Sequence, residues 1–68
     1  MKYIITEQGH RFISLENVRE FHIDRVGSMW QVTIKYWTDH FVPIICGNDL
    51  EKAEKIFQEI FEKLIDKE

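Results

Sequence analysis

Four residues of this 68-residue chain carry side chains that commonly bind metals or act as nucleophiles: His10, His22, His40 and Cys46. Zinc motifs contain ligand pairs only a few residues apart, and this spacing contains no such pair. His40 and Cys46 share one predicted strand, where their separation along the extended chain is about 20 Å. We therefore expect no metal site, no cofactor and no Cys–His nucleophilic pair.

Acid–base chemistry has one further set of candidates, because Glu20, His22 and Asp24 share one face of a predicted strand. Alternation on a solvated sheet face places polar residues at such positions without any catalytic role. Cys46 precedes the predicted helix, whose N-terminus can lower the pKa of a thiol, but a small buried cysteine is the more common case. We predict no catalytic residue and no enzymatic activity.

Trp37 differs from the other aromatic residues because it falls on the outer side of the alternating pattern in residues 29 to 37. Tryptophan beside apolar side chains is typical of the centre of a protein interface. The pattern places a candidate interface on one outer sheet face, made of Trp37, His40, Val42, Ile44 and Cys46.

The charge distribution bears on nucleic-acid binding. The net charge is −3, and acidic and basic residues cancel over residues 1 to 47. Nucleic-acid recognition normally begins with a basic face, which neither half of the chain supplies. A nucleic-acid-binding accessory protein that uses Trp37, His40 and Lys35 is therefore the alternative hypothesis, and a protein partner is the first.

The segment after Gly47 has the periodicity of a helix. Its apolar residues recur at intervals of three and four, and the segment begins with a capping-box pattern, Asn48 followed by Glu51. We predict one helix over about residues 48 to 66. The apolar stripe covers about 180° of the helix surface. This stripe is wider than a single sheet is expected to cover. The stripe comprises Leu50, Ala53, Ile56, Phe57, Ile60, Phe61, Leu64 and Ile65.

The preceding residues, 2 to 46, predict an antiparallel meander of about five strands, giving an α+β fold with the helix packed on the sheet. Gly27 and Ser28 suit a two-residue type II′ turn. This turn places three pairs opposite each other: Ile23 and Val32, Phe21 and Ile34, and Glu20 and Lys35.

A second two-residue turn is predicted at Thr38 and Asp39, which sets the register of the last strand. It places Tyr36 opposite Phe41, Ile34 opposite Pro43 and Val32 opposite Ile45. Because proline lacks a backbone donor, Pro43 predicts an edge strand or a bulge.

The stretch "FISLENVREFHI", followed by an alternating strand and "GNDLEKAEKIFQEIFEKL", resembles a pattern in short bacterial and phage proteins of unassigned function. The meander and helix also resemble part of the pleckstrin-homology topology in outline. The resemblance implies a strand and helix arrangement and carries no catalytic signature, and fold analogy transfers no function.

The length indicates a single domain over residues 1 to 68 with a thin margin of stability, which small domains often improve by associating. The chain has a single cysteine, no secretory signal and no apolar run that would span a membrane, so we expect a cytoplasmic protein. We expect a small protein-interaction module that forms a homodimer through the outer face of residues 37 to 46 and the part of the helix stripe that the sheet leaves uncovered.

Overall fold

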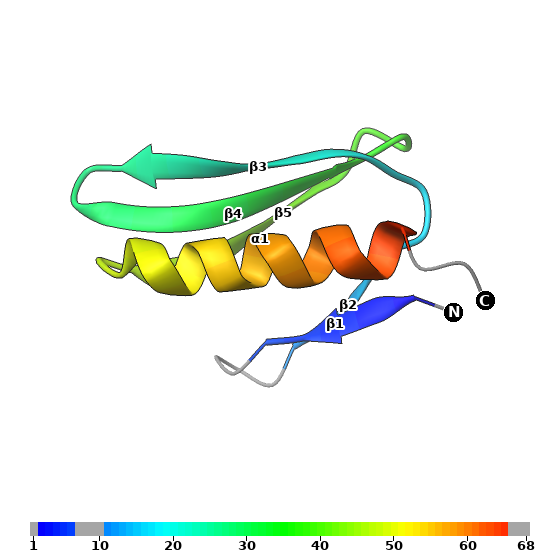
Figure 1. Ribbon diagram of the computed structural model, residues 1–68. Coiled ribbons are helices and arrows are strands. Elements are labelled where there is room, and N and C mark those ends of the chain that lie inside the picture. The colour runs from blue at the N-terminus through cyan, green and yellow to red at the C-terminus, as the bar shows by residue number, and fades with distance from the viewer. Residues whose placement is uncertain (1, 7–10, 66–68) are drawn as a thin grey trace.

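The computed structural model describes residues 2–6 and 11–65 (Figure 1). The elements follow in the order β1 (Tyr3–Ile5), β2 (Phe12–Ser14), β3 (Val18–Val26), β4 (Met29–Tyr36), β5 (Phe41–Gly47) and α1 (Leu50–Ile65). β1 and β2 form a two-stranded antiparallel sheet, and β3, β4 and β5 form a second antiparallel sheet in that order. The predicted α+β class, five strands and C-terminal helix are confirmed, with the strands divided between two sheets.

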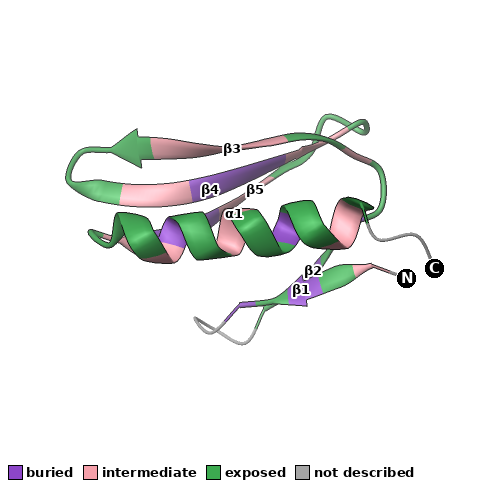
Figure 2. Cartoon of the chain, viewed as in Figure 1, coloured by how far each residue is buried: buried purple, intermediate pink, exposed green. Residues whose placement is uncertain are grey.

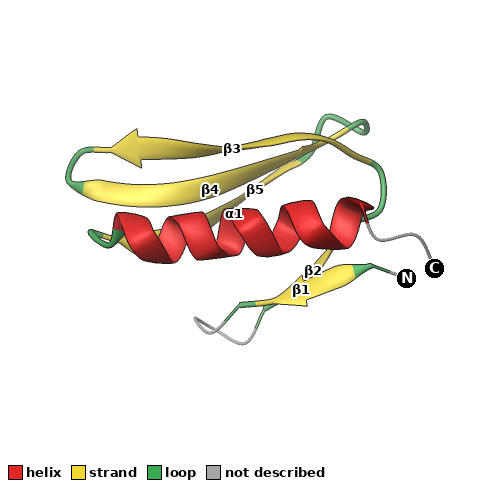
Figure 3. Cartoon of the chain, viewed as in Figure 1, coloured by secondary structure: helices red, strands yellow, loops and turns green. Residues whose placement is uncertain are grey.

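The three-stranded sheet is covered on one side only. In the view of Figure 1, α1 and the β1–β2 hairpin both lie below it (Figures 1 and 3). The buried stretches of β1, β4 and α1 appear in purple in Figure 2. The buried hydrophobic residues of both sheets and α1 form one cluster, which comprises Ile4, Ile13, Leu15, Val32, Ile34, Ile44, Cys46, Ala53 and Ile60. The opposite side of the sheet carries no element among the described residues.

The helix begins two residues later than predicted. Asp49, rather than Asn48, provides the cap, because its Oδ1 accepts a hydrogen bond from the backbone N–H of Lys52 at 3.3 Å. A carboxylate at this position satisfies one of the free N–H groups of the first turn. The predicted Asn48–Glu51 capping box is therefore wrong by one residue, while the helical periodicity of the segment is confirmed.

The first long hairpin has the predicted register. Ile23 lies opposite Val32, Phe21 opposite Ile34 and Glu20 opposite Lys35. Gly27 has a φ of 64°, and Ser28 is not among the residues with positive φ. Positive φ at the first loop position alone is the signature of a type II′ turn.

The second hairpin differs from the prediction by one residue. The N–H of Asp39 donates to the carbonyl of Tyr36 at 3.1 Å, and the N–H of Tyr36 donates to the carbonyl of His40 at 2.9 Å. Asp39 has a φ of 68°, so residues 37–39 form a three-residue loop whose last member is left-handed, a common hairpin connection.

This extra loop residue shifts β5 by one position relative to β4. Lys35 lies opposite Phe41, Ile34 opposite Val42 and Val32 opposite Ile44. Because side chains alternate along a strand, a shift of one residue exchanges the two faces of β5. The even-numbered residues that were predicted on the outer face therefore point into the core.

Candidate functional site

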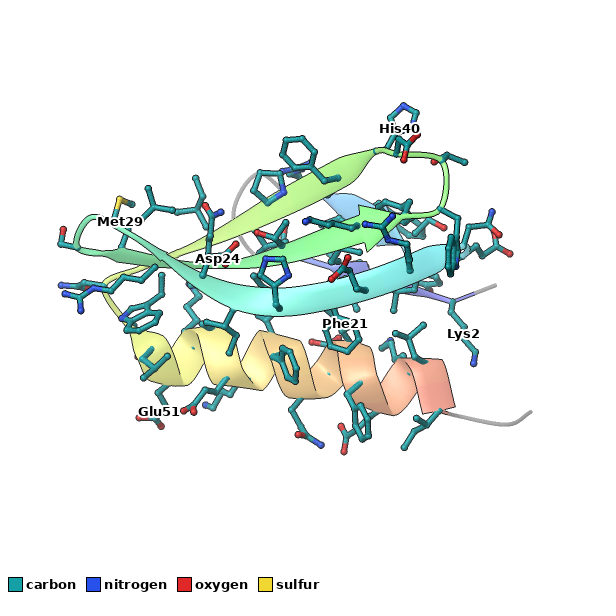
Figure 4. The ribbon with its side chains drawn as sticks, turned by 90° about the horizontal axis from the view of Figure 1, so that it is seen from above. Lys2, Phe21, Asp24, Met29, His40 and Glu51 are labelled. Carbon is teal, nitrogen blue, oxygen red and sulfur yellow. The ribbon has the colours of Figure 1, made fainter. Side chains whose placement is uncertain are left out.

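The uncovered side of the three-stranded sheet, which we call the open face, is the candidate site. Successive cross-strand pairs place three rows of side chains on it. Figure 4 looks down on this face, with α1 beyond its β3 edge. The β3 and β4 residues are polar and the β5 residues are apolar: Glu20, His22 and Asp24; Gln31, Thr33 and Lys35; Phe41, Pro43 and Ile45.

Four polar side chains of the open face form a hydrogen-bonded chain. His22 Nε2 lies 2.9 Å from Asp24 Oδ2. The Thr33 hydroxyl donates to the same Asp24 oxygen at 2.9 Å and accepts from Gln31 Nε2 at 3.3 Å. These hydrogen bonds fix the four side chains relative to one another.

The apolar side chains of the open face lie along β5 and continue to the β3–β4 turn. Phe41 is 65% exposed and Ile45 is 47% exposed. Met29 is also exposed and lies two residues along β4 from Gln31, which is opposite Ile45, while the exposed Val26 is opposite Met29. We call Val26, Met29, Phe41, Pro43 and Ile45 the apolar rim.

Pro43 limits what the rim can bind through its backbone. β5 is an edge strand, as the proline predicted. Pro43 lies opposite Thr33 at the middle of the strand, so the free edge of β5 lacks its central donor. A strand added at this edge would lose one ladder hydrogen bond, and the rim therefore offers side chains rather than a backbone template.

A second group of side chains surrounds the β4–β5 loop. Trp37 is 68% exposed, and the guanidinium of Arg19 lies 5.8 Å from its ring centroid. Arg19 also pairs with Glu20 at 3.0 Å. A shallow hollow lies beside this corner, lined by Arg19, Lys35, Tyr36, Asp39, His40 and Phe41.

The structure separates the predicted interface residues into two groups. Trp37 and His40 are exposed at the loop. Ile44 and Cys46 are only 5% and 4% exposed, and Val42 is half-buried against the core. Placing these three residues on the outer face was wrong, because the three-residue loop reverses the faces of β5. Burial also raises the pKa of the Cys46 thiol.

Sequence reasoning missed the exposed positions of the apolar rim. The signal was present, since Phe41, Pro43 and Ile45 form an alternating apolar set as complete as the even-numbered one. Asp39 distinguishes the register of a three-residue loop from that of a two-residue loop, because aspartate tolerates the left-handed conformation that the three-residue loop needs.

Within residues 2–6 and 11–65, no three His, Cys, Asp or Glu side chains come close enough to hold a metal ion. His10 lies outside the described residues. The helix in the described part of the chain is too short and too polar to cross a membrane. Comparison with known protein families, curated proteins and solved structures found no match.

Proposed function

We propose that this chain is a small non-enzymatic protein-interaction module that self-associates and contacts a protein partner through the apolar rim. The observation that carries the proposal is the row of exposed apolar side chains on the uncovered side of the three-stranded sheet, including Phe41 and Ile45. Contiguous apolar surface in a small protein is typical of interaction sites. Trp37 at the adjacent loop adds the residue type most enriched at interface centres.

The polar half of the open face supports the same function. Interfaces commonly combine an apolar centre with hydrogen-bonding groups at the margin. Thr33 and Asp24 are held by their mutual hydrogen bond, so a partner meets a preformed surface and little side-chain freedom is lost on binding. The rim would supply most of the apolar contact, and the polar row would set the orientation of the partner.

The first test removes the rim without disturbing the core. We expect the double variant Phe41→Ser, Ile45→Ser to remain folded and to bind its protein partner about ten-fold or more weakly. Phe12→Ser is the matched control, because Phe12 is equally exposed but lies on β2. The partner is identified by capture on the immobilised wild-type chain and then titrated against each purified variant. Equal affinity of the rim variant and wild type would contradict the rim as the binding surface.

Nucleic-acid binding is a second candidate, favoured by one observation. The hollow at the β4–β5 loop brings Lys35, His40 and Arg19 together beside the exposed rings of Phe41 and Trp37. Aromatic rings interleaved with basic groups are the usual platform for single-stranded nucleic acids. Asp39 in the same hollow and the net charge of −3 weaken this candidate.

Salt dependence separates the two candidates. We expect a fluorescent single-stranded oligonucleotide to show no saturable binding to the chain at about 0.15 M salt. Phosphate contacts release counterions, so true nucleic-acid binding would weaken steeply between about 0.05 and 0.2 M salt. Saturable binding with that steep dependence, lost in Lys35→Glu, would favour the second candidate over the first.

A further inference from the structure

The second edge of the three-stranded sheet differs from the edge that Pro43 protects. Among the described residues, β3 pairs only with β4 and contains no proline. The two-residue turn makes Val26 and Met29 a hydrogen-bonded pair, and antiparallel pairs alternate from there. The backbone groups of Phe21, Ile23 and Arg25 therefore point away from β4, as a free template for another strand.

Below this edge lies apolar surface that the sheet leaves partly uncovered. The rings of Phe21 and Phe57 are 4.7 Å apart, and Figure 4 shows Phe21 between β3 and α1. Leu50 and Phe61 lie on the same side of α1 as Phe57 and remain exposed. A strand that added to β3 would thus bring apolar side chains against both the edge and the helix.

We propose that β3 pairs with β3 of a second copy, antiparallel about a two-fold axis at Ile23, and joins the two sheets into one of six strands. The proposal rests on the self-association in the proposed function and names where it occurs. A two-fold contact of this kind is self-complementary, because every contact between residue i of one copy and residue j of the other occurs a second time with the two copies exchanged.

The side-chain pattern of β3 favours this register over the two adjacent ones. With Ile23 on the axis, His22 faces Asp24 of the second copy and Phe21 faces Arg25 of the second copy. Both pairs are favourable across strands. In this register the outward N–H and C=O groups of each β3 strand also hydrogen-bond to those of the other. The His22–Asp24 contact within each copy, at 2.9 Å, would extend into a ring of four alternating groups.

Two adjacent two-fold registers also keep the open faces of both copies on the same side of the joined sheet, and both are unfavourable. With His22 on the axis, Glu20 faces Asp24 of the second copy. With Asp24 on the axis, the two Asp24 carboxylates face each other. Like charges directly opposite each other destabilise a strand pair, so the sequence of β3 disfavours both alternatives. The dimer would leave the two apolar rims at its far edges, free for partners.

Sedimentation equilibrium at high micromolar concentration tests the dimer. We expect the wild-type chain to sediment with twice the mass of one chain. His22→Asp places four carboxylates at the axis and is expected to raise the dimer dissociation constant about ten-fold or more. His22→Lys is the matched control, since it faces Asp24 of the second copy and keeps the dimer. Near-ultraviolet circular dichroism establishes that both variants are folded.

Cysteine cross-linking tests the register even if His22→Asp is unstable. Mixed His22→Cys and Asp24→Cys chains should form a disulfide under mild oxidation, because directly opposed Cα atoms of this pair type are about 4.5 Å apart. Either variant alone should not, because its two cysteines would be diagonal at about 7–8 Å, beyond normal disulfide reach. Native Cys46 is buried and does not compete.

Each result decides the proposal. Cross-linking in the mixture alone supports the β3 edge and the Ile23 axis. Cross-linking of one variant by itself, or a dimer that the Phe41→Ser, Ile45→Ser variant dissociates and His22→Asp does not, overturns this interface while leaving self-association intact. A wild-type chain that is only monomeric overturns self-association as well, and leaves the rim's binding of another protein to be judged by its own titration.

Discussion

Replacing Ile44 with aspartate is expected to unfold this domain, whereas the same change at the next residue, Ile45, is expected to leave it folded. Ile44 is 5% exposed and belongs to the core cluster, while Ile45 is 47% exposed on the open face. An unpaired carboxylate in an apolar core is among the changes that cost more than about 4 kcal/mol. Small domains have little more than that in total.

Circular dichroism and thiol labelling measure this difference together. In the folded chain Cys46 is shielded, and burial raises its pKa, so at neutral pH less of the reactive thiolate is present. We expect slow labelling of the wild type and Ile45→Asp, and rapid labelling of Ile44→Asp. A folded Ile44→Asp chain beside an unfolded Ile45→Asp chain would instead establish the two-residue loop and the opposite register of β5.

The first hairpin and the helix could be predicted because several independent signals agreed. Gly27 supplies the positive φ that the turn requires, and the register it implies pairs apolar with apolar and Glu20 with Lys35. The helix has an apolar period over its whole length. A shift of one residue in the hairpin would have exposed its apolar set, so the pattern permitted one register. The helical period identifies the apolar side of α1 whichever residue begins the helix.

The second hairpin could not be predicted with the same security, because β5 is apolar on both faces. Its even residues Val42 and Ile44 and its odd residues Phe41 and Ile45 satisfy the core equally well by composition. The choice depends on one loop residue, and Asp39 adopts a conformation that other residues adopt less readily. The candidate site depends on the same choice, because the register decides which β5 side chains lie on the open face.

The separation of β1 and β2 from the larger sheet also lay beyond the sequence pattern. Both strands have three residues, too few for alternation to specify a neighbour. Their place is set by packing: Ile4 and Ile13 join the core cluster from below the sheet, beside α1. Lys2 Nζ also donates to the carbonyl of Leu64 at 3.2 Å, which ties the start of the chain to the last turn of the helix.

This packing gives α1 two neighbours, and truncating Ile60 is expected to weaken both contacts. Ile60 is fully buried in the cluster that includes Ile4 of β1 and Ile34 of β4. Removing a buried isoleucine to alanine costs about 2–5 kcal/mol, depending on how far the cavity collapses. We expect Ile60→Ala to lower the free energy of unfolding by an amount in that range, which leaves the domain at the limit of stability.

The adjacent Phe61→Ala variant is the matched control, because it removes a larger side chain from a position that is 45% exposed. We expect it to cost less than about 1.5 kcal/mol, since much of the ring is in water before and after the change. Urea unfolding at low micromolar concentration keeps association out of the comparison. Equal costs for the two variants would mean that α1 is rotated about its axis, and Phe61 would then belong to the core rather than to the surface beside the free edge of β3.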